Sequence, residues 1–332
     1  MESRIIEAIK KADKILIVTH RGPDGDAVGS AFGLKRLIMN NFDDKFVDVC
    51  ADGDISSLYS PMLRDNVINP AEMFESYDLA VVLDCPNLSR TGRFQEAIQN
   101  TAEIINIDHH GTNERFGTIN YATSKMSSTC EFLYYLAKRF GLEMDKEIAK
   151  LLYQGILTDT NCFTANTVTA NTHHALSELL GYKFDSNLIK EYYFNNQSLN
   201  KTKLEAKVLN SVKLYKHNTV AVMKIPYGDI EKHNLTFEDT MGIVDKGTSI
   251  EGVGISIILI EAGPGYVYVS LRGKGSEVDV SKFAQAFGGG GSPTIAAFQY
   301  KGELKDIEQM VHAYIKENIE ELSQDPDEKK LF

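Results

Sequence analysis

Short apolar runs alternate with helical patterns along the first half of the chain. Four runs have the length of a buried strand, at residues 15–18, 46–50, 79–83 and 104–107. Apolar residues recur at helical spacing over 28–39 and 132–139, and Ser128 and Glu131 form the pattern of a capping box before the second of these helices. Such alternation predicts an α/β domain with a mainly parallel sheet flanked by helices, and a site beyond the carboxyl ends of its strands.

The pattern changes character in the middle of the chain. Residues 181–207 are rich in Asn, Lys and Tyr and have no strong apolar face before residue 204, which is typical of a connection. Strand patterns then return at 220–225, 253–260 and 266–271, with helical patterns at 280–287 and 307–319. We therefore predict a catalytic domain (1–185), a partly helical linker (186–210), a smaller C-terminal α/β domain (211–323) and a charged tail (324–332), with the active site in the cleft between the domains.

Length and charge limit the classes of function. The chain has 332 residues, more than one hydrophobic core usually serves, which supports two domains. Lys and Arg total 35 against 46 Asp and Glu, a net charge of −11, which argues against binding to long duplex DNA. No apolar run reaches the length of a membrane span, the start lacks an apolar signal core, and the four cysteines form no CxxC pair. We therefore expect a soluble, cytoplasmic protein with reduced thiols.

The candidate chemistry begins directly after the first predicted strand. The segment from His20 to Asp26 reads His-Arg-Gly-Pro-Asp-Gly-Asp, a turn that projects an imidazole and two carboxylates, from Asp24 and Asp26, at a strand end. Such oxygen and nitrogen donors suit Mn²⁺ or Mg²⁺ better than metals that prefer thiolates. Taken alone, the segment is equally typical of a turn that uses Asp and Gly for geometry.

Three further segments favour a metal site. Asp84 ends one apolar run, Asp108, His109 and His110 follow the next, and Asp159 closes the apolar stretch 149–157. The carboxyl ends of parallel strands meet at one edge of a sheet, so these side chains are expected to converge there. The set as a whole predicts a metal centre rather than four unrelated turns.

These motifs, in order and spacing, resemble those of the DHH phosphoesterase family, and the second half resembles the DHH-associated domain. Within the family, length and layout are most similar to the oligoribonuclease and 3′,5′-bisphosphonucleotide phosphatase group (nanoRNases). The resemblance implies two Mn²⁺ ions, with Mg²⁺ or Co²⁺ as substitutes. It assigns His20, Asp24 and Asp84 to one ion, and Asp26, Asp84, His109 and Asp159 to the other. Asp108 would orient a histidine or a metal-bound water, and His110 would contact the scissile phosphate or lie just behind the metals.

Residues of the second domain are expected to hold the substrate. Arg272 and Lys274 precede a glycine run, Gly288, Gly289, Gly290 and Gly291, which we interpret as a flexible loop that presents N–H groups to an anion. Ser292 stands where the family usually has His, and Asn161 where it usually has Gly. Both departures bear on substrate choice and affinity rather than on the metals.

Near the metal motifs, Gly29 and Ser30 are expected to open the helix that follows the first strand. Gly29 then serves either close helix–sheet packing or an anion-binding helix N-terminus.

The sequence thus predicts a Mn²⁺-dependent phosphohydrolase in which a water activated by two metals attacks phosphorus. The expected substrates are short single-stranded oligoribonucleotides or 3′,5′-bisphosphoadenosine (pAp). Alternatives are a phosphodiesterase for linear dinucleotides derived from cyclic dinucleotides, a manganese pyrophosphatase, and a nucleotide-binding module without turnover. A homodimer is expected only because symmetric dimers are the commonest oligomers.

Overall fold

A computed structural model describes residues 2–63, 73–274 and 278–318 of the protein. The chain forms two compact units that divide between Asn196 and Gln197, within the predicted connection 186–210. The predicted tail, 324–332, lies outside the described residues.

The N-terminal unit is built on a five-stranded parallel sheet, where the sequence predicted a mainly parallel one. Its strands lie in the order β2-β1-β3-β4-β5, and every neighbouring pair is parallel. Their bounds are β1 Lys14–Val18, β2 Phe46–Cys50, β3 Leu79–Leu83, β4 Glu103–Asp108 and β5 Ile119–Ala122. The first four match the apolar runs closely, whereas β5, a short strand at the sheet edge, was not predicted.

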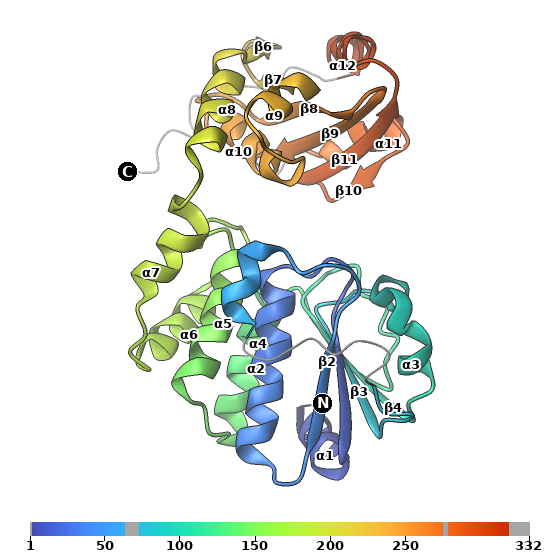
Figure 1. Ribbon diagram of the computed structural model, residues 1–332, viewed down its shortest axis with the longest axis vertical. Helices are drawn as coiled ribbons and strands as arrows, with labels where there is room; N and C mark the ends of the chain where they lie inside the picture. The colour runs from blue at the N-terminus through green and yellow to red at the C-terminus, as the bar shows by residue number, and fades with distance from the viewer. Residues whose placement is uncertain (1, 64–72, 275–277, 319–332) are drawn as a thin grey trace. The chain divides into compact units, whose positions relative to one another are not determined.

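Helices cover both faces of this sheet (Figure 1). On one side α2, α4 and α5 pack against one another, and α3 lies on the other side. The helices of this unit are α1 Glu2–Lys11, α2 Gly25–Asn41, α3 Gln95–Gln99, α4 Thr129–Phe140, α5 Lys146–Asp159, α6 Ala170–Leu180 and α7 Ser186–Lys190.

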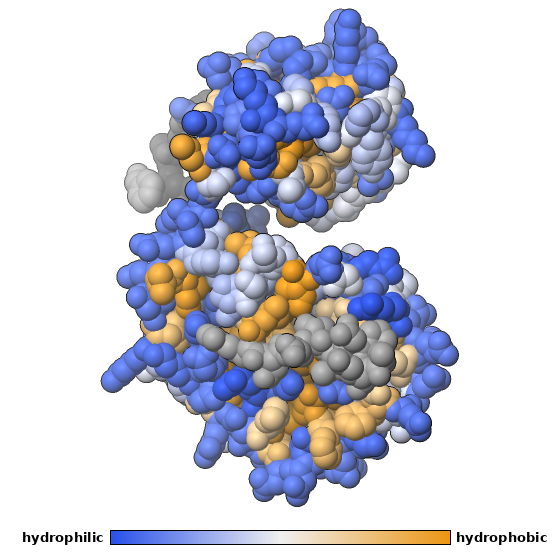
Figure 2. All heavy atoms as spheres, viewed as in Figure 1, coloured by the Kyte–Doolittle hydropathy of each residue, from blue (hydrophilic) through white to orange (hydrophobic). Residues whose placement is uncertain are grey.

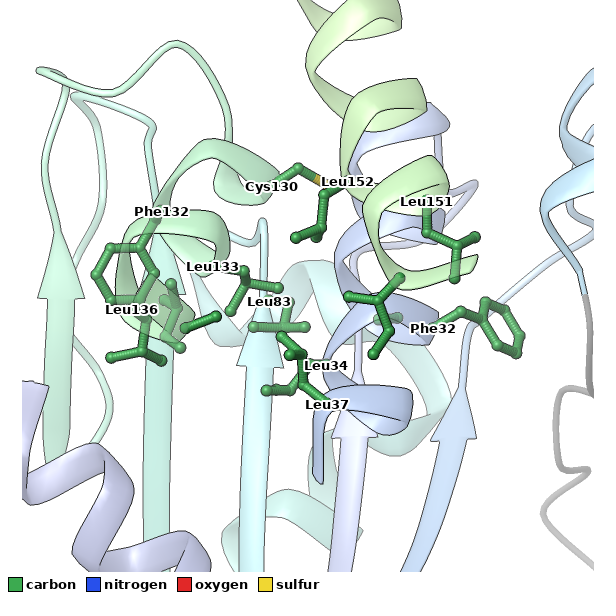
Figure 3. Packing of buried hydrophobic residues seen from close by; sticks show 14 of the residues in the cluster. Phe32, Leu34, Leu37, Leu83, Cys130, Phe132, Leu133, Leu136, Leu151 and Leu152 are labelled. Carbon is green, nitrogen blue, oxygen red and sulfur yellow. The ribbon is translucent and has the colours of Figure 1, made fainter. Parts of the chain in front are cut away.

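The strands divide their side chains between two cores. In β1, Ile15 and Ile17 join the cluster under α2, α4 and α5, whereas Leu16 and Val18 join the smaller cluster under α3. Alternate residues of a strand point to opposite faces, so a strand buried on both faces is apolar throughout. Figure 3 shows Leu83 at the end of β3 among leucines of α2 and α4.

Helix α2 begins four residues before the predicted opening at Gly29. The carboxylate of Asp24 caps the helix by accepting from the backbone N–H groups of Asp26 and Ala27, both at 3.1 Å. Gly29 therefore lies inside the helix, and a Cβ there would be 2.8 Å from the carbonyl oxygen of Leu151 in α5. Of the two alternatives, close packing explains this glycine, and the helix opens at Gly25 rather than at Gly29.

The smaller C-terminal unit holds a mixed six-stranded sheet in the order β10-β11-β9-β8-β7-β6. Among the strands that the structure describes here, β7 and β8 are parallel to each other and the other neighbouring pairs are antiparallel. Their bounds are β6 Lys213–Tyr215, β7 Val220–Ile225, β8 Ile255–Gly263, β9 Tyr266–Gly273, β10 Gly290–Gly291 and β11 Ile295–Lys301.

Helices also cover both faces of the second sheet. Residues of α11 and α12 pack on one face, and residues of α8, α9 and α10 pack on the other. These helices are α8 Leu199–Asn210, α9 Tyr227–Lys232, α10 Ile243–Thr248, α11 Val280–Ala286 and α12 Leu304–Asn318.

The glycine run is partly a strand rather than a loop, which corrects the prediction. Gly290 and Gly291 pair with Ala297 and Ala296 of β11. A Cβ at Gly289 would lie 2.2 Å from the Ala297 carbonyl oxygen, so this glycine is needed for the close approach of two backbones.

The visible surface of both units is mainly hydrophilic, with hydrophobic residues in view over parts of each unit (Figure 2). Among the described residues, no helix has both the length and the apolar character needed to cross a bilayer.

Candidate metal centre

Chemistry-bearing residues follow the carboxyl ends of three neighbouring strands. His20 comes two residues after β1, Asp84 directly after β3, and His109 directly after β4. Asp84 has a φ of 54°, a left-handed conformation that is uncommon outside glycine. Its backbone N–H donates to the carbonyl oxygen of Ile107 in β4, which holds this turn at the edge of the sheet.

The Asp84 carboxylate lies between two imidazoles. One oxygen, Oδ2, is 3.6 Å from Nε2 of His20, and the other, Oδ1, is 3.4 Å from Nε2 of His109. His20 Nε2 is also 3.9 Å from the carboxylate of Asp24, and His109 Nε2 is 3.7 Å from that of Asp159. These separations are longer than those of strong hydrogen bonds, whereas two ligands of one ion lie roughly 3 Å or more apart.

The six predicted ligands fall into groups that could each hold an ion. His20, Asp24 and Asp84 form one group, and Asp26, His109 and Asp159 form another, with donor atoms within 4.8 Å of one another in each. Asp84 also forms a third group with His109 and His110. We call the six ligands, His20, Asp24, Asp26, Asp84, His109 and Asp159, the candidate metal centre.

Asp26 is held by the N-terminus of another helix. It is fully buried, and its two carboxylate oxygens accept from the backbone N–H groups of Thr129 at 2.6 Å and Cys130 at 2.9 Å. These are the first two residues of α4, where N–H groups lack helical partners and favour negative charge. Ser128 caps α4 through Glu131 N–H as predicted, but the Glu131 carboxylate accepts from Ser127 instead of completing the capping box.

Crowded charges shift the proton affinities of the centre. Burial and the negative charges of Asp26 and Asp84 raise the pKa of Asp159 to about 8, despite the opposing effect of His109. Burial disfavours charge on His109, but Asp84 and Asp159 outweigh it and raise the pKa of His109 to about 10. Burial likewise opposes the ionisation of Asp84, but the imidazoles of His109 and His20 lower its pKa. Divalent cations would displace the extra protons and relieve the repulsion, so the donors fit such ions.

A buried polar network orients the second histidine of the motif. His110 Nδ1 lies 2.7 Å from Asp108 Oδ1, and the other Asp108 oxygen accepts from Asn113 Nδ2 at 2.7 Å. The same amide nitrogen donates to Asn106 Oδ1 at 2.8 Å. Asn106 is fully buried in β4 and donates to the carbonyl oxygens of β3 residue Val82 and of Cys85.

Three residues of this region were not predicted from the sequence. Asn113 donates to Asp108 and is itself held by Asn106, and Thr129 Oγ1 donates to Asp84 Oδ1 at 3.3 Å. A polar residue inside the apolar run 104–107 was the available signal for Asn106. Asn113 and Thr129 give no such signal because loop and helix-start positions are commonly polar.

The predicted substrate-binding residues lie in the C-terminal unit. Arg272, at the end of β9, pairs in register with Ile295 of β11, and its Nε donates to the Asp245 carboxylate at 2.8 Å. Ser292 closes the turn between β10 and β11. Its hydroxyl accepts from the N–H of Ile295 at 3.1 Å, and its backbone N–H donates to the carbonyl oxygen of Ile295 at 2.7 Å. Lys274 Nζ lies 3.5 Å from a carbonyl oxygen of α10.

Comparison with known families decides the affiliation. The model of the DHH family N-terminal domain matches residues 14–156, and that of the DHHA1 domain matches residues 217–317. The chain belongs to the DHH family. The expected family resemblance is thereby confirmed, and the protein is a hydrolase of the phosphoesterase class.

Relatives match this DHH protein over nearly its whole length. A probable bifunctional oligoribonuclease and PAP phosphatase NrnA of Streptococcus mutans is 30% identical, covering 94% of this chain and 98% of the relative. The bifunctional oligoribonuclease and PAP phosphatase NrnA of Bacillus subtilis is 27% identical, and the match covers 88% of this chain and 91% of the relative. The crystal structure of an exopolyphosphatase-related protein from Bacteroides fragilis matches with a TM-score of 0.86 at 28% identity. The match covers 94% of this chain and 96% of that chain.

Proposed function

We propose that this DHH protein is a Mn²⁺-dependent phosphohydrolase that acts on short oligoribonucleotides, on pAp, or on both. The observation that carries the proposal is the convergence of the candidate metal centre, in which the Asp84 carboxylate lies between His20 of one proposed set and His109 of the other. The substrate class follows from two full-length relatives named for oligoribonuclease and PAP phosphatase activity.

The two ligand sets divide as the family resemblance implies. His20 and Asp24 would hold one ion, Asp26, His109 and Asp159 the other, and Asp84 would bridge them. These oxygen and imidazole donors suit Mn²⁺, with Mg²⁺ and Co²⁺ as substitutes. Two such ions supply an activated water and neutralise charge on a phosphoryl group when bound.

The chain's own residues then position the substrate. Asp108 fixes the imidazole of His110 through Nδ1, which leaves Nε2 on the other side of the ring to contact the scissile phosphate. Asp108 is 3% exposed, so it would act on the substrate only through His110 and not by direct contact.

In the C-terminal unit we assign substrate binding to Arg272 and Lys274, with the glycine run and Ser292. Arg272 is fixed on both sides, by Asp245 and by the hydroxyl of Ser270, 3.2 Å from Nη1. A guanidinium held in this way is suited to recognise a phosphate or carboxylate.

A substrate panel tests the proposal. Purified protein with Mn²⁺ should release mononucleotides from RNAs of two to about ten nucleotides, or phosphate from pAp. Linear di-AMP and pyrophosphate test the other enzyme classes. Failure to turn over any of these with metal bound would leave a binding module as the better description.

Asp84→Ala tests the assignment of the centre. It removes a shared ligand, so kcat/KM should fall by more than about 1,000-fold. Calorimetric titration should show loss of Mn²⁺ binding. Asp306→Ala, which removes an exposed carboxylate from α12, is the charge-matched control and should keep full activity. Retained turnover in Asp84→Ala would refute the assignment.

A further inference from the structure

Tyr59 packs on the N-terminus of α2, where Asp24 and Asp26 supply one ligand of each proposed set. It belongs to a 3₁₀ segment, Ser57–Met62. A Cβ on Gly25, between Asp24 and Asp26, would lie 3.0 Å from Cε1 of the Tyr59 ring and 2.2 Å from Thr158 Oγ1. Only glycine leaves room for both side chains. Tyr59 is therefore a direct neighbour of the candidate metal centre.

The charge of one carboxylate from each ligand set acts on the hydroxyl of Tyr59. Burial and the charges of Asp24 and Asp159 raise the pKa of Tyr59 to about 12, although the backbone of Gly25 opposes the shift. The group keeps its proton at neutral pH. A tyrosine hydroxyl has one O–H proton to donate. Within the described residues, the Tyr59 hydroxyl donates to no oxygen, so this proton is available to a ligand.

A second tyrosine supports the ring. The rings of Tyr59 and Tyr193 lie 6.1 Å apart between centroids, with 30° between their planes. The hydroxyl of Tyr193 accepts from Nε2 of Gln154 at 3.2 Å, and Gln154 is 3% exposed in α5. Helix α5 also ends in Asp159, so one helix fixes both a proposed ligand and the support of Tyr59.

We propose that Tyr59 contacts the substrate by donating a hydrogen bond from its hydroxyl to a non-bridging oxygen of the phosphoryl group held at the candidate metal centre. This inference rests on the proposed function. A neutral donor fixed before the substrate arrives stabilises negative charge as it develops, without reorganisation. No proton is transferred in this role.

Tyr59→Phe tests the proposal because it keeps the ring and removes only the hydroxyl. With the RNA dinucleotide ApA or with pAp as substrate and Mn²⁺ present, kcat/KM should fall about 10- to 100-fold, the usual loss for one hydrogen bond to a charged group. The affinity for Mn²⁺, measured by calorimetry, should not change. Tyr135→Phe is the matched control: its hydroxyl donates to a backbone carbonyl between α4 and α6, and activity should be unchanged.

Binding of AMP to the Mn²⁺-loaded protein gives a readout that does not need turnover. Tyr59→Phe should weaken AMP binding by a similar factor, with no change for Tyr135→Phe. Unchanged kcat/KM and unchanged AMP binding would overturn the proposal, as would an activity loss that loss of Mn²⁺ fully accounts for. If the wild-type protein hydrolyses none of the substrates, the proposed function fails, while the AMP comparison still decides the role of Tyr59.

Discussion

Asp84 adopts a backbone conformation that is costly for a residue with a Cβ. Its φ of 54° bends the chain sharply at the end of β3, and this bend places the carboxylate between His20 and His109. Such conformations persist when the surroundings determine them, here through the bonds of Asp84 to Ile107 and Thr129. Backbone strain thus coincides with the residue assigned to both ions.

Asn161 also has a positive φ, 46°, and begins three consecutive left-handed residues with Cys162 and Phe163. The resemblance places Gly at this position in the family, and glycine and asparagine are the residues that adopt this conformation most easily. The departure at Asn161 therefore has a backbone explanation that does not involve the substrate.

We predict that Asn161→Gly keeps the free energy of unfolding, whereas Asn161→Ala lowers it by about 1 kcal/mol, because alanine is strained in the left-handed region. Urea denaturation of the two variants measures the difference. Asn171→Ala, at an exposed position of α6, is the control and should stay within about 0.5 kcal/mol of wild type. Equal stability of the two Asn161 variants would contradict this explanation.

At the residue scale, the sequence located the ligands but not what supports them. His20, Asp84 and His109 follow apolar runs, and strand ends could be predicted from those runs. Thr129 bonds to Asp84 from 45 positions away, and such a contact follows only from the packing of α4 on the sheet.

At the scale of elements, the approach of α2 to α5 is set by glycines. Gly29 faces the Leu151 backbone oxygen, whereas a Cβ at Gly33 would meet Cδ2 of the Leu152 side chain at 2.9 Å. A side chain can turn away, but a backbone carbonyl inside a helix cannot.

Gly29→Ala is therefore expected to lower the free energy of unfolding by about 1–3 kcal/mol, even though alanine favours helix by up to about 1 kcal/mol. Gly33→Ala, one turn along the same helix, should cost clearly less and serves as the control. The measurement is urea denaturation with metal removed. A stabilising effect at Gly29 would show that α2 and α5 are less closely packed than described.

Strongly apolar elements were predictable, and half-buried ones were not. The strands β1, β3, β7 and β9 are each built on an apolar run, and their positions were predicted to within about two residues. Strand β5 is half-buried at a sheet edge, and β11 alternates between exposed and buried residues. The glycines of β10 have no side-chain pattern at all, so only their pairing with β11 makes them a strand.

For the whole molecule, the net charge of −11 includes four carboxylates of the candidate metal centre. Two divalent ions would add +4, giving −11 + 4 = −7. The cytoplasmic location, the homodimer, the exclusion of duplex DNA and the cleft between the domains remain predictions.

The stability of the metal-free protein should fall as pH rises. The pKa of Asp159 is raised from 3.8 to about 8 and that of His109 from 6.5 to about 10, so the folded state binds more protons than the unfolded chain. This stabilisation is lost as pH rises through the folded values, and from about pH 6.5 to 8 both groups act in the same direction. The Tm of the chelator-treated protein should decrease across that range.

Excess Mn²⁺ should oppose this decrease, because the ion competes with protons for the same ligands. The gap in Tm between the Mn²⁺-loaded and chelator-treated protein should widen with pH. In Asp84→Ala the gap should be absent at every pH. A metal-free Tm that rises between pH 6.5 and 8 would contradict the described charge arrangement.

The proposed ligands are spread over positions 20 to 159, and this spacing has a kinetic consequence. The set of His20, Asp24 and Asp84 needs β1 and β3 paired, and Asp159 also needs α5 docked. Bringing residues so distant in sequence together costs loop-closure entropy before their contacts can form. An ion bound there stabilises the native state more than the folding transition state, so it slows unfolding without speeding folding. The supply of metal would then govern how long each folded molecule survives in addition to whether it is active.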